Sequence, residues 1–94
     1  MKIIWSPTAR RKIDEIIDYI SRDDIEAAYA LVDDLEKRVD TLKRHPHLGR
    51  MVSIINDEMI RELIVTANYS VIYEVNGAQI DILTIRHARE NRDV

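Results

Sequence analysis

The sequence has no cysteine, no phenylalanine, and only two glycines and two prolines among its 94 residues. Without cysteine, disulfide bonds and cysteine-ligated zinc are excluded. No apolar run approaches the ~20 residues that a membrane-spanning helix requires, and the opening residues 1–7 lack the length and cleavage site of a signal peptide. We therefore expect a soluble cytoplasmic protein. A chain of this length makes one domain, residues 1–94.

An excess of positive charge is also missing. The 14 Lys and Arg residues are outnumbered by 17 Asp and Glu residues, which gives a formal net charge of -3 at pH 7. Proteins that bind nucleic acid broadly are usually basic, so this balance argues against such a binder while permitting a local basic patch. Gly49 and Gly77 both stand in turn sequences, so no glycine-rich phosphate loop is present. We expect no cofactor.

The histidines do not indicate a metal centre. His45 and His47 flank Pro46 in a short turn, and no third ligand stands near them in the sequence. A protein zinc site usually needs three or four ligands. We therefore predict no metal site.

Two amphipathic helices are predicted in the first half of the chain. Ser6 suits an N-cap and Pro7 suits the first helical position, so the first helix should cover about residues 7–21. Asp23 and Glu26 fit a capping box for the second helix. Its apolar positions recur three and four apart and stop before His45-Pro46. The short connection predicts an antiparallel hairpin. The apolar positions of the second helix are Ile25, Ala28, Val32, Leu35, Val39 and Leu42.

The period of the pattern changes to two in the second half. Residues 60–65, 69–75 and 79–87 read as strands, and residues 2–5 form a further short one. Asn76-Gly77 predicts a tight type I′ hairpin turn. The order β-α-α-β-β-β predicts an α+β fold in which a helical hairpin packs on one face of a mostly antiparallel sheet.

Neither face of the predicted sheet is cleanly polar. One face would carry Tyr69, Val71 and Tyr73, and the other would carry Ile72, Leu83 and Ile85. Two helices can cover only one face, so the other should remain partly open as an apolar floor for a partner. The alternative is that these are scattered surface apolar residues, which proteins tolerate. The pattern does not decide which face is free.

The end of the last strand carries candidates for acid–base chemistry. His87 can exchange a proton near neutral pH, and Arg61, Arg86 and Arg89 could stabilise a phosphoryl transition state. However, Arg86 and His87 are consecutive, so in a regular strand their side chains leave on opposite faces. The alternative is that His87 ends a strand and makes local hydrogen bonds.

Five segments together carry a resemblance to a known family. They read W-S-P-T-A-R-R-K-I-D-E-I-I-D-Y-I, A-A-Y-A-L-V-D-D-L, L-K-R-H-P-H-L-G-R, I-R-E-L-I-V-T-A-N-Y-S-V-I-Y-E-V and I-L-T-I-R-H-A-R-E. In this order and spacing, the chain resembles the ParE branch of the RelE/ParE superfamily of bacterial type II toxins. The resemblance covers nearly the whole chain.

The resemblance implies a toxin that a cognate antitoxin neutralises by wrapping around it, partly against the sheet. ParE-like toxins are understood to poison DNA gyrase, whereas RelE-like toxins cut messenger RNA on the ribosome. The negative net charge, the absence of lysine after Lys43 and the absence of tyrosine after Tyr73 favour the gyrase reading. The alternatives are a metal-independent endoribonuclease that uses Arg61 and His87, and an inactive toxin homologue.

The partner-binding residues expected from this reading form two groups. One is a positive rim at one end of the sheet, which would contact an acidic stretch of the antitoxin or target. The other is the apolar floor described above. The rim consists of Arg61, Arg86, His87, Arg89 and Arg92. The floor would consist either of Ile72, Leu83 and Ile85 or of Tyr69, Val71 and Tyr73.

Overall fold

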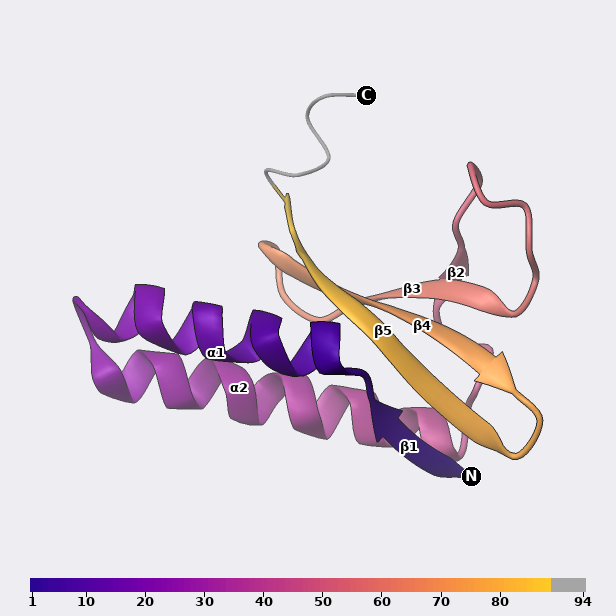
Figure 1. The fold of residues 1–94 in the computed structure, drawn as a ribbon, viewed down its shortest axis with the longest axis horizontal. Coiled ribbons are helices and arrows are strands. Elements are labelled where there is room, and N and C mark those ends of the chain that lie inside the picture. Colours follow the sequence, from indigo (N-terminus) through magenta and orange to yellow (C-terminus); the bar gives the residue numbers. More distant parts are fainter. Residues whose placement is uncertain (89–94) are drawn as a thin grey trace.

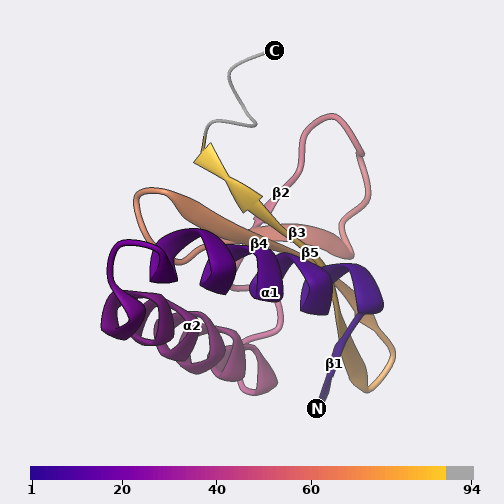
Figure 2. The same ribbon diagram turned by 60° about the vertical axis from the view of Figure 1, so that its left-hand side comes forward.

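A computed structural model describes residues 1–88 of the chain. Two helices pack against one face of a single five-stranded sheet (Figures 1 and 2). The sheet order is β1-β5-β4-β3-β2, with β1 parallel to β5 and every other pair antiparallel. The predicted α+β fold is therefore confirmed. Its elements are β1 (Lys2–Trp5), α1 (Pro7–Ser21), α2 (Ile25–Asp40), a 3-10 turn η1 (Thr41–Lys43), β2 (Arg50–Met51), β3 (Ile60–Ile64), β4 (Tyr69–Asn76) and β5 (Gln79–His87).

Both helices begin at side-chain caps. The Ser6 hydroxyl accepts a hydrogen bond from the amide of Ala9 at 3.0 Å and donates one to the carbonyl of Leu83 at 2.8 Å, so this cap also ties α1 to β5. Asp24, and not Asp23, caps α2 by accepting from the amide of Ala27 at 3.1 Å. The predicted capping box was therefore placed one residue too early.

A β-bulge in β5 sets which side chains reach the core. Ile72 pairs with Thr84 while the next residue, Tyr73, pairs with Ile82, so Leu83 is an extra residue without a partner on β4. The bulge shifts the alternation of β5, and Ile82 and Ile85 both become buried on the side of the helices. The regular alternation predicted for this strand was wrong for this reason.

The core lies between the helical hairpin and this face of the sheet. Tyr73 is its largest fully buried side chain, while Trp5 and Tyr69 pack partly buried against it. The alternation predicted for β4 is confirmed, because Val71 and Tyr73 belong to the core cluster and Ile72 does not. The main cluster consists of Ala9, Ile16, Leu35, Val39, Leu42, Leu63, Val71, Tyr73, Ile80, Ile82 and Ile85.

The hairpin between β4 and β5 differs from the predicted turn. Asn76 pairs with Gln79, so the two loop residues are Gly77 and Ala78. Of these two loop residues, only Gly77 has a positive φ, 62°. A positive φ at the first loop position alone is typical of a type II′ turn and not of the predicted type I′ turn.

We expect Ser6→Ala to lower the free energy of unfolding by about 1–2 kcal/mol, because it removes both a helix cap and a tie to β5. The control is Ser21→Ala, whose hydroxyl makes only an exposed 3.3 Å bond to the carbonyl of Asp18. Urea unfolding measures both variants. Equal losses in the two would contradict the role assigned to Ser6.

Candidate functional site

The face of the sheet away from the helices is mainly polar. Glu62, Ser70, Thr84 and Arg86 lie on it, together with the apolar side chains of Ile60, Ile64 and Ile72, of which Ile64 is 50% exposed. Val71, Tyr73 and Ile85 face the helices and are buried, so they are not accessible on this side. The predicted group of Ile72, Leu83 and Ile85 is therefore not assembled on one face, because the bulge turns Ile85 toward the helices and separates it from Ile72.

A buried carboxylate organises this open face. Glu62 is only 5% exposed. Its Oε1 accepts from Arg50 Nε at 3.2 Å and from Nη2 at 2.9 Å, and its Oε2 accepts from the Ser70 hydroxyl at 2.6 Å. Burial by itself raises the pKa of Glu62, but the bonds from Ser70 and Arg50 and the charges of Arg50 and Arg86 outweigh it and lower the pKa. Glu62 is therefore ionised at neutral pH.

The turn before β2 is held by two side chains from the sheet. The buried Tyr73 hydroxyl donates to the carbonyl of Pro46 at 2.7 Å and accepts from the amide of Gly49 at 2.9 Å. Arg61 Nη1 donates to the carbonyl of Gly49 at 2.9 Å, and its Nε donates to the carbonyl of Glu58 at 3.0 Å. Arg61 therefore serves to hold backbone carbonyls in place.

Gly49 is required in this turn because of space. A Cβ atom there would lie 2.8 Å from the carbonyl oxygen of Glu62 and 2.8 Å from the ring of Tyr73. Such distances are shorter than van der Waals contact, so any larger residue would push the turn off the sheet. The pKa of the Tyr73 hydroxyl is raised, since burial outweighs the hydrogen bond with Gly49 and the charge of Arg61, which lower it.

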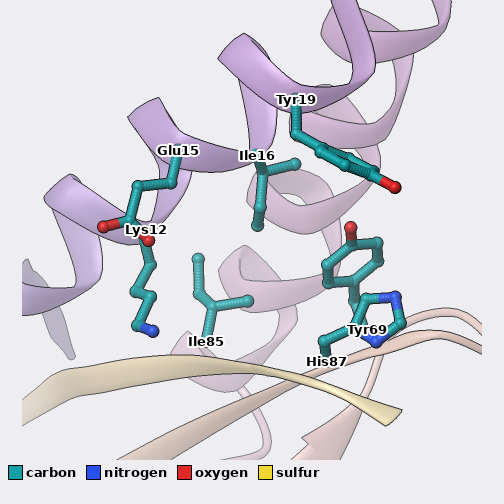
Figure 3. A pocket seen from close by; sticks show the side chains of 7 residues that line it. All are labelled: Lys12, Glu15, Ile16, Tyr19, Tyr69, Ile85 and His87. Carbon is teal, nitrogen blue, oxygen red and sulfur yellow. The ribbon is translucent and has the colours of Figure 1, made fainter. Parts of the chain in front are cut away.

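A groove of about 400 Å³ lies on the opposite side, between α1 and the end of the sheet. Figure 3 shows Tyr69 and His87 rising from the sheet toward Ile16 and Tyr19 of α1. The rings of Tyr69 and His87 meet edge to face, with centroids 4.8 Å apart. Tyr19 is 64% exposed at the rim. The groove is lined by Lys12, Glu15, Ile16, Tyr19, Tyr69, Ile85 and His87.

The structure brings together only part of the predicted site. Tyr69, Ile85 and His87 share the groove beside α1. Arg86 lies on the opposite face near Glu62, as expected for consecutive strand residues. Leu83 occupies the bulge. Arg89 and Arg92 fall outside the described residues.

Arg61 and His87 do not form one centre. Arg61 pairs with Tyr73 and His87 pairs with Tyr69, so the two positions are offset by four residues along β4 and lie on strands either side of it. At about 3.3 Å per residue, this offset alone is roughly 13 Å. Neither the catalytic pair nor a single rim containing Arg61, Arg86 and His87 is assembled.

The network of Arg50, Glu62 and Ser70 was missed in the sequence. β2 consists of two residues, Arg50 pairing with Glu62 and Met51 with Arg61, and a strand this short leaves no periodic pattern. The available signal was Glu62 itself, a carboxylate at the centre of the strand Ile60–Ile64, which needs a partner when it is buried.

Residues 1–88 contain no group of three or more His, Asp or Glu side chains placed to hold a metal ion. Within the same part of the chain, no helix is long and apolar enough to cross a membrane.

Comparison with known proteins extends over almost all of the chain. The family model described as ParE toxin of type II toxin-antitoxin system, parDE, matches residues 3–92. The chain is 34% identical to the candidate toxin Y4kP of Sinorhizobium fredii, covering 95% of this chain and 90% of that one. It is 30% identical to Toxin RelE2 of Caulobacter vibrioides, and the match covers 93% of this chain and 94% of that one. A chain of the chromosomal ParDE system from P. aeruginosa superimposes with a TM-score of 0.77 at 26% identity. The superposition covers 93% of this chain and 95% of that one.

We expect the stability contributed by Glu62 to depend on pH. Its pKa is lowered in the folded state from the usual value of 4.5. The contribution is therefore complete above about pH 4.5 and is lost as the pH falls through the folded pKa. The difference in unfolding free energy between the wild type and Glu62→Gln should shrink at acid pH.

Unfolding titrations from pH 7 down to acid conditions measure this difference. Glu36→Gln on α2 is the control, because Glu36 is exposed. A wild-type advantage over Glu62→Gln that stays constant across the range would contradict the account of this network.

Proposed function

We propose, from the fact that the chain belongs to the ParE toxin family of type II toxin–antitoxin systems, that it acts in the cytoplasm by binding DNA gyrase. In this proposal inhibition occurs through protein–protein contact without covalent chemistry, and a cognate antitoxin encoded beside the toxin neutralises it.

The observation that carries this proposal is the separation of Arg61 from His87. A ribonuclease needs an acid, a base and a cation around one phosphate. Here Arg61 is occupied by the carbonyls of Gly49 and Glu58, while His87 packs against Tyr69 in the groove on α1. This arrangement supports a toxin that acts by binding.

The groove between α1 and the sheet is suited to the antitoxin. Ile16, Ile85 and the Tyr69 ring form its apolar wall, and Lys12 and Glu15 stand at its rim. Its volume of about 400 Å³ can take large apolar side chains from a single segment. An amphipathic helix or strand that places such side chains here would bury surface that the toxin leaves open alone.

The target is tested with two assays on the purified protein. We expect it to inhibit supercoiling by gyrase and to leave messages uncut when primer extension is carried out on translated RNA. His87→Ala should inhibit supercoiling as the wild type does, because His87 lies in the groove assigned to the antitoxin. Site-specific cleavage that disappears in His87→Ala would contradict the proposal and establish a nuclease.

The antitoxin groove is tested with Tyr19→Ala. This change should weaken binding to the product of the neighbouring reading frame by about tenfold or more, since buried aromatic anchors dominate interface energies. Growth arrest by the toxin alone should be unchanged. Tyr29→Ala is the matched control, because Tyr29 is 58% exposed on α2 and does not line the groove. Equal binding by the two variants, measured by calorimetry, would place the antitoxin elsewhere.

A further inference from the structure

The loop between β2 and β3 displays an unusual amount of apolar surface. Ile54 is 82% exposed, the highest value among the large apolar side chains of residues 1–88. Met51, Ile55 and Met59 are exposed in the same segment. The loop projects from the sheet as a separate arm (Figure 1). A concentration of exposed apolar side chains in one segment indicates an interaction surface.

Backbone hydrogen bonds close the turns of this loop. The amides of Ile55 and Asn56 donate to the carbonyl of Val52 at 3.1 and 3.3 Å, and the amide of Val75 donates to the carbonyl of Met59 at 2.8 Å. Asn56 adopts a φ of 54°, a region that asparagine tolerates better than most residues. The apolar side chains are therefore presented on turns that satisfy part of their own backbone hydrogen bonding.

A groove of about 340 Å³ runs from this arm onto the open face of the sheet. Met51 and Ile54 line it from the arm, and Arg50, Glu62 and Arg86 line it from the sheet. It is separate from the groove beside α1, with which it shares no residue.

The charges in this groove are unbalanced. Two guanidinium groups, Arg50 and Arg86, act on the single carboxylate of Glu62. Arg50 binds Glu62 directly, but Arg86 makes no hydrogen bond to any of residues 1–88 through its side chain. The lining of this groove therefore carries two positive charges and one negative charge. A carboxylate from a partner, placed between the two arginines, would balance the remaining positive charge and accept charge-assisted hydrogen bonds from them.

We infer that this groove, lined by Arg50, Met51, Ile54 and Arg86, binds the toxin's protein target through a segment that carries an acidic side chain next to a large apolar one. The inference rests on the proposed function, because it assigns the target-binding surface of a toxin that acts by contact. The carboxylate would lie between Arg50 and Arg86, and the apolar side chain would pack on Met51 and Ile54. The groove beside α1 would bind a different polypeptide, the antitoxin.

The test compares two groove variants with two matched controls. Ile54→Ser and Arg86→Gln remove the apolar and charged contributions. Ile25→Ser, at a position 59% exposed on the helical hairpin, and Arg44→Gln, exposed after η1, make the same changes outside the groove. Thermal unfolding confirms that each variant folds, and growth arrest is scored per amount of soluble protein.

We expect the groove variants to need about tenfold more protein for the same growth arrest, whereas the controls match the wild type. Arg86→Lys, which keeps the charge, should retain most of the effect. Binding to the product of the neighbouring reading frame should persist in both groove variants. Groove variants that arrest growth as strongly as the wild type overturn the inference. So do groove variants that lose antitoxin binding but keep toxicity, since the groove would then belong to the antitoxin.

Supercoiling assays separate this inference from the choice of gyrase. If the wild type inhibits gyrase and the groove variants inhibit equally, the groove assignment fails and the proposed function stands. If the wild type arrests growth through the groove but leaves gyrase active, the groove assignment stands and the proposed target fails.

Discussion

The rest of the structure depends on the hydroxyl group of Tyr73. From the centre of the core it donates to the carbonyl of Pro46 and accepts from the amide of Gly49, and so it fixes the turn that follows the helical hairpin. Gly49 must be glycine because the turn presses against the Tyr73 ring and the backbone of β3. Arg61 completes the attachment by binding the Gly49 carbonyl. With the turn fixed, β2 begins at Arg50, directly opposite Glu62.

This attachment explains how a small toxin fold can present two different surfaces. Arg61 binds the carbonyls of Gly49 and Glu58 and lies four residues along β4 from the end of the sheet where His87 lies. On the open face, residues of the β2–β3 arm line a charged groove together with Glu62 and the arginines. The opposite side, beside α1, keeps an apolar groove. Two surfaces of different chemistry suit the two partners, a target and an antitoxin, that the proposed function assigns to this chain.

The sequence predicted the elements well because their signals are local. Helical spacing and Ser6-Pro7 located α1, and the period of two located β3, β4 and β5 to within about one residue. The bulge at Leu83 was not predictable, since the apolar residues of this strand fit more than one alternation. Asp23 and Asp24 have equal capping propensity, so only packing could decide between them. The Glu62 network and the separation of Arg61 from His87 depend on contacts between distant segments, which leave no local pattern.

The central claim is that Arg61 holds the turn and does not take part in catalysis. The most direct measurement is Arg61→Gln, with unfolding free energy and growth arrest determined on the same preparation. The account predicts a loss of about 1–2 kcal/mol in unfolding free energy, because the Gly49 and Glu58 carbonyls lose a charged donor, with full growth arrest per folded molecule. Unchanged stability together with abolished growth arrest would contradict it.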